Sequence, residues 1–126
     1  MKIFVEIGCC YFDTLYPLLD EGWKGYMVDP IKEYFDKHTP HPKLTLIQSA
    51  VTAQRLHSTS TIELTYVDKK HYEHLTEIER RDYDGMSSTQ PFRTGFSLGQ
   101  FGNYKIGDIQ TRIVPTISLN WLIKYY

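Results

Sequence analysis

Short apolar runs alternate with polar stretches in residues 1–51, and this pattern predicts the fold. The apolar runs cover residues 3–7, 26–28 and 44–47, with the last one continuing to Val51. The first run is rich in β-branched residues, which is typical of a strand buried on both faces in a parallel sheet that helices cover. We therefore expect three strands in this part of the chain.

The stretches between these runs carry helix signals. Asp13 or Thr14 can cap a first helix that Gly22 ends, and Asp29 with Pro30 resembles the start of a second one. The inward positions of the two helices are Leu15, Leu18 and Leu19, then Ile31, Tyr34 and Phe35. Strand and helix thus alternate twice, which predicts an α/β fold with a Rossmann-like, doubly wound, mostly parallel sheet.

An acid interrupts the first strand. Glu6 lies among apolar neighbours, where an ionised carboxylate is costly to bury without a hydrogen-bond donor. In open α/β sheets ligands bind at the carboxyl ends of the strands, so we expect Glu6 near the ligand end. Gly8 follows and permits a tight turn there.

The pattern is weaker after Val51. Residues 61–67 alternate as a half-exposed strand, and the charged residues 69–81 allow a helical turn or two. Residues 82–108 have no periodicity and hold five of the eight glycines, which predicts a long loop, either a lid that closes over a site or a disordered segment. Residues 109–114 form a further strand candidate. Ser118 can cap a last helix that carries Leu119, Leu122 and Ile123.

Composition narrows the class of partner. The 126 residues fit one domain, 1–126, and 14 basic residues against 15 acidic ones give no reason to expect a nucleic acid or a lipid surface. No apolar run suits a signal peptide or a bilayer span, so we expect no membrane partner and a cytoplasmic location. Adjacent Cys9 and Cys10 are expected to be reduced, packed residues.

No metal site is expected. His38 with His41, and His71 with His74, are three residues apart, but no cysteine joins either pair and Pro40 interrupts the first. We interpret these histidines as surface residues.

Several segments together resemble a known family. Residues 4–8, 28–30, 49–51, 84–88 and 114–119 match, in order and spacing, the motifs of the FkbM-like S-adenosylmethionine-dependent methyltransferases. The resemblance implies the class I methyltransferase fold and S-adenosylmethionine as cofactor. It spans nearly the whole chain, yet the chain corresponds to about the first half of the family's domain, so the fold is expected to be truncated.

The resemblance also implies a set of cofactor contacts. Glu6 and Gly8 would contact the methionine part, Asp29 the ribose hydroxyls, and the backbone near Ala50 the adenine edge. The cofactor-binding residues implied in this way are Glu6, Gly8, Cys9, Thr14, Asp29, Pro30, Ile31 and Ala50. The usual second small residue of the turn is missing, because Tyr11 and Phe12 follow the two cysteines.

The implied activity is methyl transfer to a hydroxyl group of a small molecule or a glycan. Asp84, Ser87 and Ser88 would lie in a loop over this acceptor, and the catalytic residues are unknown. A nicotinamide-dependent oxidoreductase fits less well, because its turn needs small residues for the pyrophosphate.

The alternative function is a truncated, non-catalytic Rossmann-like binding or assembly module. In this interpretation Asp29 is only a helix cap. The first strand would have an open apolar edge, which we expect the C-terminal segment or a second copy of the chain to cover, the latter giving a homo-oligomer.

Overall fold

The computed structural model divides into two compact units, and each is described by itself. Unit 1 comprises Met1–Thr61 with Val114–Tyr126, and unit 2 comprises Ile62–Ile113. The residues that the structure describes are 1–10, 14–53, 60–67, 70, 76, 87–88 and 109–125. The expectation of a single domain stays a prediction.

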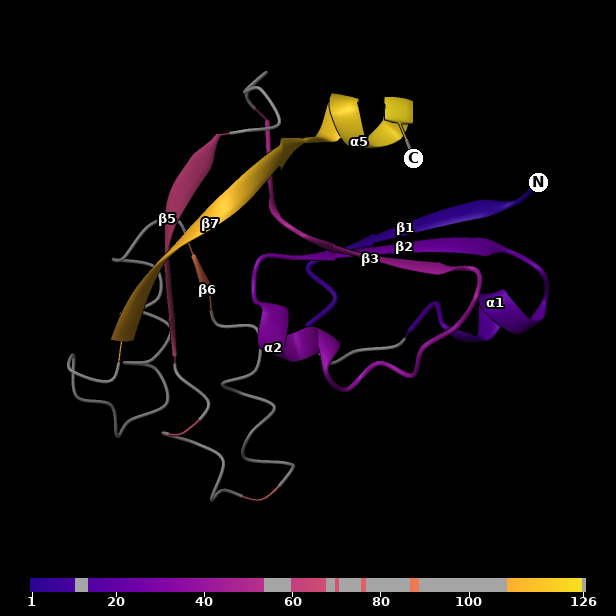
Figure 1. The fold of residues 1–126 in the computed structure, drawn as a ribbon, viewed down its shortest axis with the longest axis horizontal. Coiled ribbons are helices and arrows are strands. Elements are labelled where there is room, and N and C mark those ends of the chain that lie inside the picture. The colour runs from indigo at the N-terminus through magenta and orange to yellow at the C-terminus, as the bar shows by residue number, and fades with distance from the viewer. Residues whose placement is uncertain are drawn as a thin grey trace. The chain divides into compact units, whose positions relative to one another are not determined.

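A parallel three-stranded sheet forms the centre of unit 1. Its strands are β1 (Ile3–Ile7), β2 (Lys24–Asp29) and β3 (Leu44–Gln48), in the order β1-β2-β3 (Figure 1). The predicted strand positions and their parallel pairing are confirmed. The chain is a small α/β protein whose sheets are compatible with a Rossmann-like fold.

The two crossover helices are short. α1 (Pro17–Asp20) and α2 (Lys32–Phe35) are single turns, and no side chain caps either of them. The predicted caps at Thr14 and Asp29 are therefore wrong, because each helix begins two residues later than these signals indicated, and Asp13 lies outside the described residues. Gly22 does end the first segment, with a φ of 94° that favours glycine.

One face of the sheet lies toward α1 and α2 (Figure 1). Phe4 in β1 is opposite Gly25 in β2, and a Cβ at Gly25 would lie 2.4 Å from the tip of the Phe4 ring. Only glycine leaves room for this ring. Met27, fully buried, and Asp29 alternate with Gly25 onto the same face.

The opposite face is only partly covered. Leu122 of α5 (Leu119–Tyr125) packs in a buried cluster with Val28 and Ile117. The aliphatic side chains of β1 on this face remain exposed, at 39% for Ile3, 36% for Val5 and 48% for Ile7. The prediction that both faces of the first strand are buried is thus wrong, because β1 is an edge strand and α5 packs over β2 instead.

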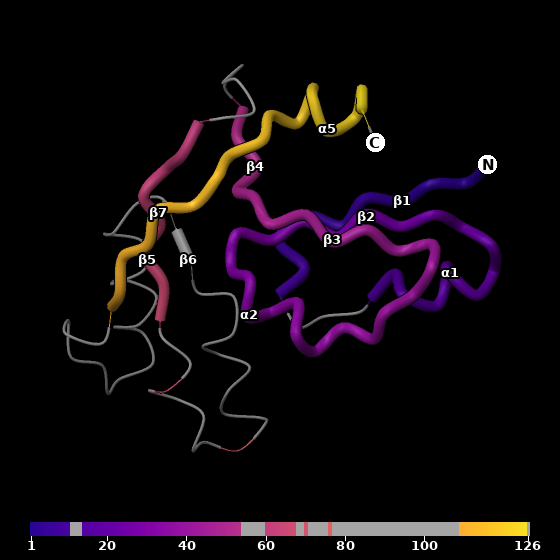
Figure 2. Tube along the Cα trace, viewed as in Figure 1, coloured from indigo at the N-terminus to yellow at the C-terminus, as the bar shows by residue number. Residues whose placement is uncertain are grey.

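The predicted third strand is two strands. β3 ends at Gln48, and β4 (Ala50–Thr52) then pairs in parallel with the carboxyl half of β7 (Ile109–Ser118), with Ala50 opposite Thr116 (Figure 2). β7 extends beyond the predicted 109–114. Because it joins β4, the C-terminal strand does not pair with β1. Coverage of the β1 edge by a second copy stays a prediction.

Unit 2 contains β5 (Thr61–Val67) from Ile62 onward, β6 (Ser87–Ser88) and the amino half of β7, in the order β7-β5-β6. The bounds of β5 are as predicted, but it is more buried than expected, with Leu64, Thr65 and Val67 shielded from solvent. Arg112 of β7 donates a hydrogen bond to the Tyr66 hydroxyl at 3.1 Å. The helical prediction for residues 69–81 and most of the 82–108 loop prediction lie outside the described residues.

The described helices are all too short or too polar to cross a membrane.

Candidate functional site

The carboxyl ends of β1 and β2 meet in a tight turn. The Gly8 amide donates to the Val28 carbonyl at 2.8 Å, which continues the ladder by one residue and brings the following turn beside the end of β2. Gly8 has a φ of 71° and Cys10 a φ of 50°. The need for glycine at position 8 was predicted, whereas the left-handed conformation of a cysteine was not. We call residues 8–10 the glycine turn.

Asp29 joins this turn to the segment that precedes α2. Its Oδ2 accepts a hydrogen bond from the Cys10 amide at 2.9 Å, and its Oδ1 accepts one from the Ile31 amide at 2.8 Å. The side chain is almost completely buried, with 4% of its surface exposed. Burial raises the pKa of Asp29 above its usual 3.8, although both amide bonds and the nearby His38 act in the opposite direction. Asp29 is therefore a buried carboxylate at the junction of two loops.

A thiol lies close to two carboxylates at the same place. Burial raises the pKa of Cys9 to about 12, and the negative charges of Asp29 and Glu6 add to this effect. Both cysteines are free and buried, as predicted. The structure thus brings together Glu6 of β1, Cys9 of the glycine turn and Asp29 of β2.

The thiols should be unreactive in the folded protein. At pH 8 a pKa of about 12 instead of 9.0 lowers the thiolate fraction of Cys9 about a thousandfold. We expect Ellman's reagent to label the native protein far more slowly than the protein in urea, and a Cys9→Ser variant to show that Cys10 is shielded too. Rapid labelling of the native protein would contradict the burial of this turn.

The same shift has a consequence for stability at alkaline pH. The folded state keeps the Cys9 proton at a pH where the unfolded chain loses it. The free energy of unfolding should therefore fall as the pH rises from 9 toward 12.

His38 belongs to the site, although the sequence predicted a surface residue. Only 8% of it is exposed, and its Nε2 donates to the Cys10 carbonyl at 3.1 Å. The sequence favours a surface position for His38 because Pro40 interrupts the helix and no cysteine joins the His38–His41 pair. The signal for burial was nevertheless present, since His38 continues the inward spacing of Ile31 and Tyr34, which are also buried.

The other implied cofactor contacts are placed in different ways. Ile31 and Ala50 are buried, and Ser49 next to Ala50 donates its amide to the Asp29 carbonyl at 3.1 Å. Pro30 is half-buried, while Thr14 is exposed. The structure therefore brings the end of β3 to the same edge as Asp29.

Of the three residues expected over the acceptor, the structure describes Ser87 and Ser88. Ser87 and Ser88 pair with β5 in unit 2, with Ser87 opposite Tyr66. Asp84, Tyr11 and Phe12 lie outside the described residues, so the lid prediction stays a prediction.

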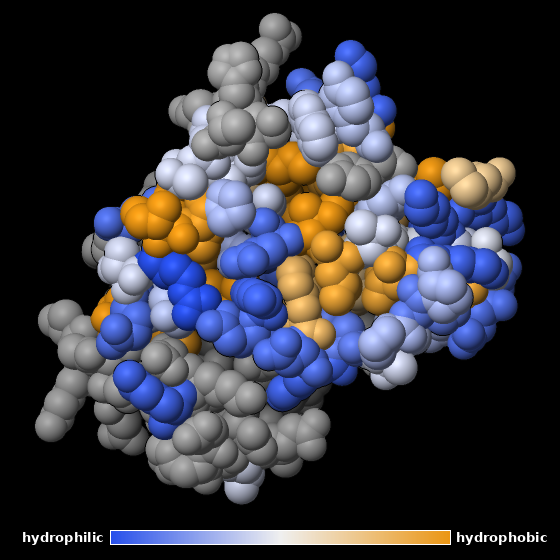
Figure 3. Space-filling model, in the orientation of Figure 1, coloured by the Kyte–Doolittle hydropathy of each residue, from blue (hydrophilic) through white to orange (hydrophobic). Residues whose placement is uncertain are grey.

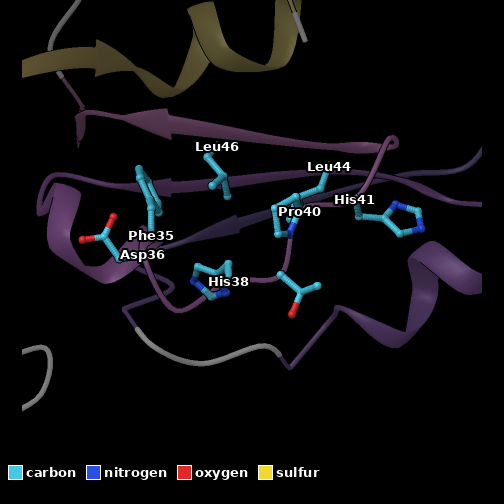
Figure 4. A pocket seen from close by; sticks show the side chains of 8 residues that line it. Phe35, Asp36, His38, Pro40, His41, Leu44 and Leu46 are labelled. Atoms are coloured by element: carbon cyan, nitrogen blue, oxygen red, sulfur yellow. The ribbon is translucent and has the colours of Figure 1, made fainter.

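A cavity of about 420 Å³ adjoins the site through His38. It lies between the end of α2 and β3, where apolar side chains gather on the surface (Figures 3 and 4). Its lining residues are Phe35, Asp36, His38, Thr39, Pro40, His41, Leu44 and Leu46. The His41 Nδ1 accepts the Lys43 amide at 3.1 Å and its Nε2 is 4.0 Å from Asp20, so this ring is held at the rim.

Among the described residues, no group of three or more histidine, cysteine, aspartate or glutamate side chains is arranged to bind a metal ion.

Comparisons of the chain with protein-family models, with curated proteins and with solved structures found no match. The fold and the site together define an α/β protein with a glycine turn and a buried acid at the carboxyl ends of two parallel strands.

Proposed function

We propose that this chain binds S-adenosylmethionine at the carboxyl ends of β1 and β2, as part of a doubly wound fold of the class I methyltransferase type. The reaction we propose is transfer of the sulfonium methyl group to a hydroxyl group of a small molecule or a glycan. The observation that carries the proposal is the direct meeting of the glycine turn with Asp29, through the 2.9 Å bond from the Cys10 amide.

The surroundings of Gly8 support an approaching ligand. Apart from its two chain neighbours, no atom of the described residues lies within 4 Å of a Cβ placed at Gly8, so these residues leave space beside the backbone of the turn. Next to it, the Glu6 and Asp29 carboxylates are close enough to raise the pKa of Cys9 together. Two nearby negative charges suit the positive sulfonium and ammonium groups of the cofactor.

Asp29 has the chemistry needed for a ribose. A carboxylate has about four lone-pair positions, and the described hydrogen bonds to Asp29 use one on each oxygen. Two adjacent ribose hydroxyls can donate hydrogen bonds to the Asp29 carboxylate, as the Cys10 and Ile31 amides do in the structure. The lone-pair positions that remain can accept the two hydroxyls while the Cys10 and Ile31 amides stay bound. Because the side chain is only 4% exposed, neighbouring side chains must shift for a hydroxyl to reach it.

Methyl transfer to a hydroxyl group depends mainly on the alignment of donor and acceptor and less on acid–base catalysis. When bound, S-adenosylmethionine supplies an electrophilic methyl group on a positively charged sulfur. The chain would contribute orientation, by holding the methionine part at Gly8 and the ribose at Asp29, and alignment of donor and acceptor accounts for much of the catalysis in such displacements. We assign no catalytic base.

Titration calorimetry with S-adenosylhomocysteine tests the proposal. We expect measurable binding to the unchanged chain. The affinity of Asp29→Asn should be lower by at least about tenfold, because this variant loses a charge-assisted hydrogen bond. Asp20→Asn, an exposed aspartate in α1, should bind like the unchanged chain. Urea unfolding confirms that each variant is folded. Absence of binding to the folded, unchanged chain would refute the proposal.

A non-catalytic binding or assembly module is the second candidate. It is favoured by the burial of Asp29, whose two oxygens already bind backbone amides, so that the acid can be explained by folding alone. The exposed Ile3, Val5 and Ile7 on the edge strand β1 add an apolar surface for a second copy of the chain. Failure of the calorimetric test would leave this function in place.

A further inference from the structure

The glycine turn contains a residue whose backbone needs to be held in place. Cys10 has a φ of 50°, in the left-handed region where the Cβ of an L-residue comes too close to the following carbonyl oxygen. Gly8, two residues earlier, adopts a φ of 71° without this close contact. Other contacts must therefore keep Cys10 in the conformation that directs its amide at Asp29.

Two side chains hold the Cys10 residue from opposite ends. Asp29 accepts its amide hydrogen at 2.9 Å, and His38 lies 3.1 Å from its carbonyl oxygen. A carbonyl oxygen only accepts, so Nε2 of His38 must carry the hydrogen. His38 comes from the segment after α2, 28 residues further along the chain, and thus ties that segment to the turn after β1.

We propose that His38 is a positioning residue of the glycine turn: its Nε2 hydrogen bond keeps Cys10 left-handed and so keeps the Cys10 amide on Asp29. The positioning role is independent of the proposed function, whereas its effect on ligand affinity rests on that function. His38 would then influence the binding of S-adenosylhomocysteine while acting on the ligand site solely through the backbone of Cys10.

The surroundings of His38 suggest suitable variants. The ring faces the cavity between α2 and β3, near Phe35 at 6.4 Å between ring centroids and across from Leu46 (Figure 4). An apolar side chain therefore fits at position 38 but cannot donate to Cys10. In His38→Gln the amide nitrogen can replace Nε2 as the donor. Cys10→Gly removes the need for the donor, since glycine adopts the left-handed conformation freely.

Amide hydrogen exchange, followed by NMR, tests the positioning role. The amide of residue 10 reports the bond to Asp29, and the Gly8 amide, bonded to Val28, is the internal control. In His38→Leu we expect exchange at residue 10 to be about tenfold faster with little change at Gly8. Protection should return in His38→Gln and in the double variant Cys10→Gly/His38→Leu.

Two results would overturn the inference. One is unchanged protection of residue 10 in His38→Leu. The other is an equal loss at residue 10 and Gly8 that the added Cys10→Gly does not reverse, because this indicates a general loss of stability.

A measurement on the unchanged chain covers the case in which His38→Leu does not fold. Long-range ¹H–¹⁵N spectra should show the His38 ring with its hydrogen on Nε2, and a ring with Nε2 unprotonated would contradict the bond to Cys10.

The affinity for S-adenosylhomocysteine separates this inference from the proposed function. If both hold, His38→Leu binds about tenfold more weakly and the double variant recovers. If exchange behaves as expected but no variant binds the ligand, the positioning role stands and the proposed function fails. If the unchanged chain binds and His38→Leu binds equally well, the role of His38 in the site is refuted.

Discussion

Replacement of Asp29 by alanine is expected to lower the free energy of unfolding by about 2–4 kcal/mol. The variant leaves the amides of Cys10 and Ile31 without their acceptor in a buried place, and each unsatisfied donor costs roughly 1–3 kcal/mol. Removal of the buried charge offsets part of this loss. Urea denaturation at pH 7 measures the difference.

Asp20→Ala is the matched control. The Asp20 side chain is exposed and its distance of 4.0 Å to His41 is long for an ion pair, so we expect a change below about 0.5 kcal/mol. Equal effects of the two substitutions would show that Asp29 does not join the two loops.

The effect of Asp29 should depend on pH in a defined direction. Burial raises the pKa of Asp29 in the folded state, so the folded chain takes up a proton at a pH where the unfolded chain is still ionised. The contribution of Asp29 to the free energy of unfolding therefore increases as the pH falls from that raised pKa toward 3.8. The difference between the unchanged chain and Asp29→Ala should widen in this range, whereas Asp20→Ala should follow the unchanged chain.

Leu122→Ala is expected to destabilise the protein by about 2–5 kcal/mol. Leu122 is fully buried against Val28 and Ile117, and its truncation removes apolar contacts and leaves a cavity. A helix as short as α5 is not stable alone, so its docking depends on this side chain. Chemical denaturation gives the loss, and limited proteolysis should show earlier cleavage within α5.

The neighbouring Ile123→Ala is the control for this prediction. Ile123 is 69% exposed, so its truncation should change the stability by less than about 0.5 kcal/mol. If the two substitutions were equivalent, α5 would not pack on the sheet through Leu122.

Much of the sheet could be predicted from local pattern. The runs at β1, β2 and β3 are short and rich in β-branched or aromatic residues, and the segments between them contain helix and turn signals. Parallel pairing follows, because such crossovers place consecutive strands side by side with the same direction. Since parallel strands end at one edge, the proximity of Gly8 to Asp29 also follows from the sequence.

The cap of α5 was predictable for the same local reason. Ser118 accepts the Trp121 amide at 3.1 Å, a contact three residues away that needs no tertiary information. The caps of α1 and α2 failed, because the residues with capping side chains lie before the helices actually begin. Asp29 instead uses its oxygens to join two loops.

The partners of edge strands could not be predicted from pattern. β7 has an apolar carboxyl half. From the sequence alone, this half could pair with more than one of the predicted strands. It pairs with β4, after the chain leaves the first sheet at Ser49, and so β1 keeps an exposed edge and an exposed aliphatic face. The pairing of β4 with β7 joins residues more than sixty positions apart in the chain, and Leu122 of α5 packs on Val28 in the same unit, so local pattern does not indicate this pairing.

Periodicity, turn chemistry and the handedness of crossovers are local properties, so the amino-acid pattern alone predicts the three parallel strands, the cap of α5 and the convergence of Glu6, Gly8 and Asp29 at one edge. Two contacts are evident only in the folded chain: Asp29 binds the Cys10 amide, and His38 binds the Cys10 carbonyl. Both contacts depend on the exact conformation of a backbone turn. That conformation requires contacts supplied by residues 19 and 28 positions away in the chain.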